Sequence, residues 1–217
     1  MKDWENEGKR RLEILNRLGA SYPGSIRQLC ALKFGTPYQL LIATILSAQC
    51  TDERVNSTTR RLFEVCGSPQ EMSKMSQEEL ESLIYSTGFY KNKSKNILEM
   101  TKVLLLRYGG EVPDTIEALT GLPGVGRKTA NVVLSVAFSK PGLPVDTHVG
   151  RLSLRLGLTR EKDPVKVERD LMSWVPPDRA GGLSLRLILH GRSVCLARKP
   201  RCGLCILADL CPSSTLV

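Results

Sequence analysis

Apolar residues recur at intervals of three and four positions along most of the chain, and no segment keeps the alternation that predicts a half-buried β-strand. The first such stripe contains Leu12, Leu15 and Leu18. Further helical stripes cover 37–49, 52–66, 80–86, 91–107, 115–120, 127–140, 147–157, 165–175 and 182–190. The pattern predicts an all-α protein of about ten short helices with short connections.

Residues that cap helix N-termini precede many of these stripes and indicate where the helices begin. Ser76 is followed by Glu79, the spacing of a capping box, directly before the apolar run at Leu80. The other predicted caps are Thr36, Thr51, Ser68, Asp114, Asp146 and Asp163.

Charge narrows the class of partner. The 217 residues include 31 basic and 22 acidic side chains, a net charge of +9. Such a balance favours nucleic acid or an anionic membrane surface. The longest uncharged apolar run, 40–48, is about half of what a membrane-spanning helix needs, and the N-terminus lacks an apolar segment of signal-peptide length. We therefore expect a cytoplasmic, nucleoid-associated protein without a membrane partner.

The cysteines fall into two groups. Four lie within seventeen residues with the spacing C-x6-C-x2-C-x5-C, and thiolates this close can converge on zinc or on an iron–sulfur cluster. Because only one short C-x2-C pair is present, the spacing favours the cluster, and zinc remains the alternative. These four are Cys195, Cys202, Cys205 and Cys211, while Cys30, Cys50 and Cys66 are interpreted as small buried apolar residues.

The segment between the first two clustered cysteines carries Arg198, Lys199 and Arg201. A loop fixed by a metal centre and bearing three cations is suited to contact phosphates. The alternative is a solvated basic turn.

The sequence LPGVGRKTANVVLSVAF, residues 122–138, places a glycine turn before an apolar helix. Gly124 and Gly126 lie between two predicted helices, so backbone N–H groups at the start of the second helix can hold a phosphate oxygen. Arg127 and Lys128 follow in its first turn.

Lys128 is a candidate nucleophile. A cation at the positive end of a helix dipole is disfavoured, and partial burial adds to this effect. Both effects favour the neutral amine, which is the form that attacks carbon. Asp146, in the apolar segment LPVDTHV, could stabilise a cationic sugar transition state, although an aspartate here could also be a plain N-terminal cap. His148 is interpreted as a structural or phosphate-side group, and His190 as a packing or capping residue.

Taken together, these motifs resemble the helix-hairpin-helix DNA glycosylases, and most closely the endonuclease III family. The resemblance rests on LSAQCTD (46–52), GFYKNKSKNI (88–97), LPGVGRKTANVVL (122–134), VDTHV (145–149) and LILHGRSVCLARKPRCGLC (187–205). It spans nearly the whole chain in the order found in that family.

The resemblance implies two helical domains. One is a six-helix, barrel-type domain over 30–140 that contains the helix-hairpin-helix motif. The other combines 1–29 with 141–217 around a [4Fe–4S] cluster held by the four clustered cysteines. It also implies that Lys128 is the nucleophile and Asp146 its partner.

The resemblance further implies a monomeric, bifunctional DNA glycosylase and AP lyase of base excision repair. Its partner would be double-stranded DNA containing damaged pyrimidines or abasic sites. Gln49 would fill the gap left by the extruded base and Phe89, where the family usually has leucine, would wedge into the opposite strand. The expected DNA contacts are Gln49, Phe89, Lys91, Gly124, Gly126, Arg127, Thr129, His148, Arg198, Lys199 and Arg201.

Two other interpretations stay open. A monofunctional adenine glycosylase of the same superfamily would carry a carboxylate on the helix over 37–49 and would lack the lysine, whereas this chain has no acid there and has Lys128. A non-catalytic helix-hairpin-helix DNA-binding protein with a stabilising metal would explain the hairpin, the charge and the cysteines, but not the joint presence of Lys128 and Asp146.

Overall fold

The computed structural model describes residues 4–216, and within this range every regular element is a helix, as the sequence predicts. The chain divides into two compact units, Cys30–Lys140 and the combination of Met1–Leu29 with Pro141–Val217. None of the helices in the described range is both long and apolar enough to cross a lipid bilayer.

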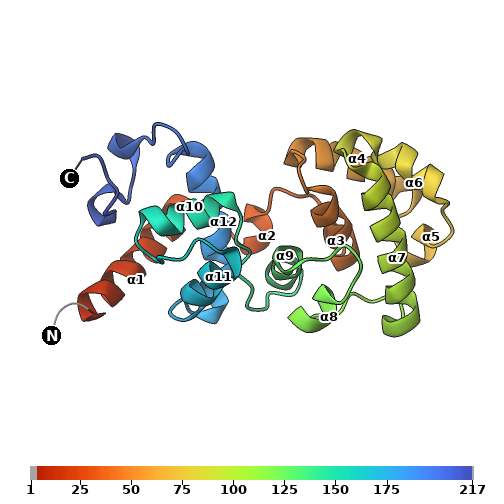
Figure 1. Cartoon of the computed structure of the whole chain (residues 1–217), viewed down its shortest axis with the longest axis horizontal. Helices are drawn as coiled ribbons and strands as arrows, with labels where there is room; N and C mark the ends of the chain where they lie inside the picture. The colour runs from red at the N-terminus through yellow and green to blue at the C-terminus, as the bar shows by residue number, and fades with distance from the viewer. Residues whose placement is uncertain (1–3, 217) are drawn as a thin grey trace. The chain divides into compact units, whose positions relative to one another are not determined.

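The unit Cys30–Lys140 packs its helices around one apolar core, which includes Leu41, Ile42, Leu62, Met100 and Val133. Figure 1 shows these helices in orange to green. The single-turn helix α5 begins directly after Ser68, one of the predicted caps. The elements are α3 (Pro37–Leu46), α4 (Asp52–Val65), α5 (Pro69–Met72), α6 (Gln77–Ile84), the 3-10 turn η1 (Tyr85–Thr87), α7 (Tyr90–Tyr108), α8 (Ile116–Thr120) and α9 (Arg127–Ala137).

The other unit is built from both ends of the chain. Helices α1 and α12 pack against each other although they are far apart in the sequence (Figure 1). The core includes Ile14, Leu18, Val149, Leu171 and Leu187. The elements are α1 (Trp4–Ser21), α2 (Ile26–Leu29), α10 (Thr147–Arg155), α11 (Pro164–Met172), η2 (Pro177–Arg179), α12 (Ala180–Ser193), η3 (Cys202–Leu204) and η4 (Ala208–Leu210).

Two arginines of α1 connect that helix to the C-terminal segment. Arg10 donates to the carbonyl oxygens of Leu156 at 2.8 Å and Leu210 at 2.9 Å. Arg17 donates to the carbonyl oxygen of Ile206 at 3.0 Å and pairs with Asp209 at 2.7 Å. These carbonyls lie at helix ends or in a turn, and those of Ile206 and Leu210 belong to the cysteine-rich segment, so the N-terminal helix stabilises that segment.

Most predicted N-terminal caps are confirmed. The side chains of Thr36, Thr51, Ser68, Ser76, Asp146 and Asp163 all accept hydrogen bonds from backbone N–H groups of the helices they precede. The prediction for Asp114 is wrong, because Thr115 caps α8 by accepting from the N–H of Ala118. The Asp114 carboxylate instead pairs with Lys140 at 2.6 Å.

Candidate functional site

The turn between α8 and α9 combines an anchored apolar part with exposed glycines. Leu122 and Val125 are buried, and the N–H of Val125 donates to the carbonyl oxygen of Leu122 at 3.1 Å. Gly124 is exposed and has φ +74°. A Cβ atom there would lie 2.7 Å from Cβ of Asn96 on α7. This position therefore requires glycine for both its backbone conformation and its close approach to α7.

Helix α9 begins differently from most helices of the chain. Its N-terminal cap is Gly126, in an extended conformation, and this residue has no side chain with which to cap the helix. A Cβ at Gly126 would meet nothing within 4 Å. Open space at the Gly126 position and a helix start that its own cap residue leaves uncapped are suited to an anion.

The basic pair follows at this helix end. Arg127 and Lys128 are exposed, and Thr129 is half-buried. The expectation that Lys128 is partly buried is wrong for the protein alone. Helix α9 buries the opposite face, which carries Ala130, Val133 and Leu134, and the lysine side chain extends into solvent. Packing of α9 within its own unit therefore does not desolvate this amine.

Asp146 lies in the other unit and caps α10. Its Oδ1 accepts a hydrogen bond from the N–H of Val149 at 2.8 Å, and the side chain is half-buried. The preceding residues 142–145 are all buried, which fixes the position of the carboxylate. His148 is also half-buried, and its Nδ1 lies 3.2 Å from the Arg151 guanidinium.

Gln49 and Phe89, expected to enter DNA, both adopt left-handed backbone conformations, with φ of 54° and 49°. Both are exposed; the exposed fraction of Phe89 is 64%, unusual for a phenylalanine. Phe89 is the N-terminal cap residue of α7, and the exposed Lys91 lies in the first turn of that helix. Left-handed non-glycine residues are energetically costly and concentrate at functional sites.

Sequence reasoning missed a buried lysine beside these two residues. Lys93 is 5% exposed, and its Nζ donates to the carbonyl oxygens of Leu46, Ala48 and Thr87 at 2.9, 2.9 and 2.8 Å. Burial lowers the pKa of Lys93. Nothing in the run KNKSK distinguishes this lysine from the exposed Lys91 and Lys95.

The four clustered cysteines line one largely apolar cavity in the C-terminal segment. Within residues 4–216, no group of three or more His, Cys, Asp or Glu side chains is placed to hold a single metal ion. Thiols spread around a cavity suit a polyatomic iron–sulfur cluster better than zinc, whose ligands must meet about 2.3 Å from one atom. The lining cysteines are Cys195, Cys202, Cys205 and Cys211.

Two side chains that the sequence did not assign to this centre contact its thiols. Arg155 of α10 donates to Sγ of Cys195 at 3.3 Å and to the carbonyl oxygen of Leu196 at 2.7 Å. His190, expected to be a packing or capping residue, has Nε2 3.3 Å from Sγ of Cys205 and Nδ1 3.0 Å from the Tyr22 hydroxyl. Burial lowers the pKa of His190, which favours the neutral ring in this apolar setting.

The thiols themselves differ in environment. Burial raises the pKa of Cys205 and of Cys211, whereas hydrogen bonds from Thr215 lower the pKa of Cys202. A cationic iron centre would offset the cost of ionising the buried pair. The donor set and the apolar wall therefore fit a cluster.

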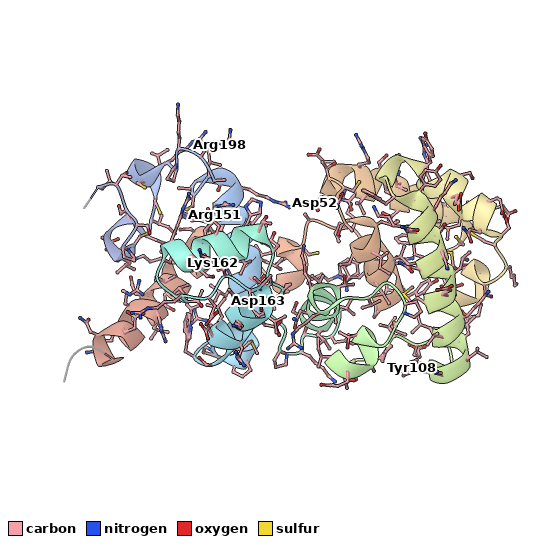
Figure 2. The ribbon with its side chains drawn as sticks, viewed as in Figure 1. Asp52, Tyr108, Arg151, Lys162, Asp163 and Arg198 are labelled. Atoms are coloured by element: carbon pink, nitrogen blue, oxygen red, sulfur yellow. The ribbon has the colours of Figure 1, made fainter. Side chains whose placement is uncertain are left out.

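The segment between Cys195 and Cys202 forms an exposed basic loop. Arg198, Lys199 and Arg201 are all exposed, and Lys199 has φ 52°. Figure 2 shows Arg198 on this loop with its side chain directed away from the ribbon. Three cations on a segment held by neighbouring cysteines are placed to contact phosphates.

Two family models match the chain. The HhH-GPD superfamily base excision DNA repair protein model covers residues 42–177, and the iron–sulfur binding domain of endonuclease III covers residues 195–211. The second range begins and ends at the outer two of the four clustered cysteines.

Similar proteins extend over almost the full length. Endonuclease III of Synechocystis sp. is 50% identical, with 99% of this chain and 97% of that protein covered. Endonuclease III of Escherichia coli (strain K12) is 45% identical, with 93% and 94% covered.

Two solved structures match with a TM-score of 0.88 and 42% identity: a non-covalent endonuclease III–DNA complex, and a trapped endonuclease III–DNA covalent intermediate. Each match covers 95% of this chain, and 95% and 96% of the respective solved chains.

Proposed function

Because the chain belongs to the endonuclease III family of the HhH-GPD superfamily, we propose that it is a bifunctional DNA glycosylase and AP lyase of base excision repair. It removes oxidised pyrimidines from double-stranded DNA and cleaves the strand 3′ to the resulting abasic site. The observation that carries this proposal is the start of α9, where an exposed lysine adjoins a glycine turn without a side-chain cap.

In this proposal Lys128 is the nucleophile. Its neutral amine attacks the anomeric carbon of the sugar, and the damaged base departs with the proton that the amine releases. The ring bond C1′–O4′ then breaks, O4′ takes up a proton, and the nitrogen lone pair forms the C=N bond of a protonated Schiff base. Loss of a proton from the adjacent sugar carbon then expels the 3′ phosphate by β-elimination. Asp146, fixed by its capping bond to Val149, stabilises positive charge on the sugar. The same lysine acts on a site that has already lost its base.

The remaining site residues bind DNA. Gly124, Gly126, Arg127 and Thr129 present backbone and side-chain donors to one phosphate region at the start of α9. Gln49 fills the space left by the extruded base, Phe89 wedges into the opposite strand, and Lys91 adds a phosphate contact. His148, Arg198, Lys199 and Arg201 contribute phosphate contacts from the other unit.

The two units have separate parts in this scheme. Residues 30–140 form the helical barrel domain with the helix-hairpin-helix motif, and 1–29 with 141–217 form the iron–sulfur domain. The four clustered cysteines would hold a [4Fe–4S] cluster, which when bound would offset part of the charge of the thiolates and fix the basic loop. The protein acts as a monomer associated with the nucleoid.

Borohydride trapping on a duplex with a single abasic site tests the proposal. The wild-type protein should give a covalent adduct, because reduction of the Schiff base locks the lysine onto the sugar. Lys128→Ala should give none, and the rate of strand cleavage should fall by at least about 100-fold.

Lys140→Ala is the matched control, since Lys140 is an exposed lysine of the same unit whose side chain pairs with Asp114. It should trap as the wild type does. Absence of an adduct from folded, iron-loaded wild-type protein would contradict the lyase assignment and leave a monofunctional glycosylase or a non-catalytic DNA-binding protein.

A further inference from the structure

The buried Lys93 makes three strong hydrogen bonds with one atom. Its Nζ lies 2.8–2.9 Å from three carbonyl oxygens, those of Leu46, Ala48 and Thr87. An ammonium group has three N–H donors and no acceptor, so all of its donors are used. A neutral amine would leave one carbonyl facing a lone pair, and the arrangement therefore requires the charged form.

Backbone dipoles, rather than an acid, compensate this buried charge. Leu46 is the last residue of α3, and Thr87 is the last residue of η1. Carbonyl groups at helix C-termini carry partial negative charge and lack partners within their own helix. Lys93 thus satisfies carbonyls at the ends of two different elements.

The same bonds connect the two segments that carry the proposed intercalating residues. Ala48 directly precedes Gln49, and Thr87 precedes Gly88 and Phe89. Gln49 and Phe89 both have left-handed backbones. In addition, the backbone N–H of Lys93 donates to the carbonyl oxygen of Phe89 at 3.1 Å. Lys93 therefore contacts the backbone of Ala48, which adjoins Gln49, and the backbone of Thr87 and Phe89.

We propose that Lys93 is a positioning residue that fixes the segments of Gln49 and Phe89 relative to each other, so that both side chains enter the duplex at one lesion. This inference rests on the proposed function. Lys93 itself touches no substrate, because its three donors are held by the protein. Without it, either side chain can still reach DNA, but their spacing is no longer set.

Loss of Lys93 should therefore weaken binding to damaged DNA but not binding to undamaged DNA. Binding to undamaged duplex depends on phosphate contacts at the start of α9 and on the basic loop, which Lys93 does not touch. Binding to a duplex with an abasic-site analogue requires insertion of Gln49 and Phe89 as well. The ratio of the two affinities reports on insertion, whereas a partly unfolded sample lowers the binding-competent fraction for both duplexes equally.

The first experiment measures this ratio by fluorescence anisotropy with a tetrahydrofuran abasic-site analogue and the matching intact duplex. Lys93→Met should lower the preference for the abasic duplex by about tenfold or more, since three charge-assisted hydrogen bonds are lost. Lys93→Gln, which keeps two donors, should have an intermediate effect and serves if Lys93→Met does not fold. Lys102→Met removes an exposed lysine from the same helix and should leave the ratio unchanged.

A double-mutant cycle with Phe89→Ala then separates positioning from general support of the fold. If Lys93 acts through the wedge, the double variant Lys93→Met/Phe89→Ala should have nearly the same abasic preference as the more affected single variant. Effects that multiply, or a preference unchanged by both Lys93 variants, would overturn the inference.

Failure of the proposed function gives a different result. In that case the wild-type protein would give no borohydride adduct on an abasic duplex. A wild type that traps, together with Lys93 variants that keep their preference for damage, would reject the role of Lys93 alone.

Discussion

Gly124 and Gly126 occupy the same turn, but their surroundings differ. Gly124 has a left-handed backbone and a Cβ there would lie 2.7 Å from Cβ of Asn96, whereas Gly126 has an ordinary extended backbone with open space where a Cβ would point. The sequence predicts a glycine turn but cannot rank its two glycines, because the difference comes from α7, about thirty residues earlier.

Gly124→Ala should therefore destabilise the protein by about 2–4 kcal/mol, the sum of left-handed strain and overpacking. Gly126→Ala should cost only about 0.5–1 kcal/mol, because alanine is a poorer helix cap than glycine. Urea unfolding of both variants measures the two values. Equal destabilisation would show that the contact with Asn96 does not constrain the turn.

At the scale of single residues, the sequence predicted the wrong lysine to be buried. The apolar helix that follows Lys128 predicts partial burial of this lysine, yet it is exposed, while Lys93 is buried against the C-terminal ends of α3 and η1. Helical periodicity shows which face of a helix is apolar, but the two faces of α7 near its start carry similar polar residues. The carbonyls that hold Lys93 come from segments about 6 and about 45 residues away, so no local pattern reveals it.

At the scale of the element, helix starts were the most predictable feature. A cap acts within three residues of its own position, so Ser76 with Glu79 is sufficient to define the start of α6. The failure at Asp114 also has a local cause. Asp114 and Thr115 are adjacent capping residues, and Lys140, which is distant in the sequence, pairs with Asp114 and leaves Thr115 to cap α8.

The capping box of α6 should make a pH-dependent contribution to stability. Hydrogen bonds from the backbone N–H and the hydroxyl of Ser76 hold the pKa of Glu79 below its usual value. Because the folded-state pKa is depressed, the stabilisation is present above the unfolded-state pKa and is lost as the pH falls through the folded value. Glu79→Ala should lower Tm at pH 7 and have progressively less effect below about pH 4.

Thermal unfolding of Glu79→Ala and the wild type across this pH range measures the difference. Glu78→Ala is the control, since it removes an exposed acidic residue of the same first turn without touching the box. A difference between Glu79→Ala and the wild type that stays constant with pH would contradict this account.

At the scale of the whole molecule, helix periodicity does not reveal that both chain ends form one unit. Arg10 and Arg17 of α1 bind carbonyls of Leu156, Ile206 and Leu210, which lie about 150–200 residues away. In the sequence these arginines read as part of the polar face of an amphipathic helix. Only the resemblance to a known family, carried by motifs spread over the chain, predicted this arrangement, because contacts between distant segments leave no local periodic signal.

The net charge of the chain and a charge that contacts a phosphate directly predict different effects on DNA binding. The chain carries nine more basic than acidic residues, which alone attracts any polyanion over long range. A direct phosphate contact instead releases counterions, and each such contact adds about one unit to the slope of log Kd against log salt concentration. Arg198→Ala should reduce that slope by about one unit and weaken binding equally for all sequences.

Lys162→Ala removes the same charge from an exposed position before α11 in the same unit, away from the basic loop (Figure 2). It should leave the slope nearly unchanged, because a charge outside the contact surface releases no counterion from DNA. Equal reductions for Arg198→Ala and Lys162→Ala would mean that net charge, and not the cysteine-anchored loop, determines the salt dependence. A reduction confined to Arg198→Ala places a phosphate at that loop when DNA is bound.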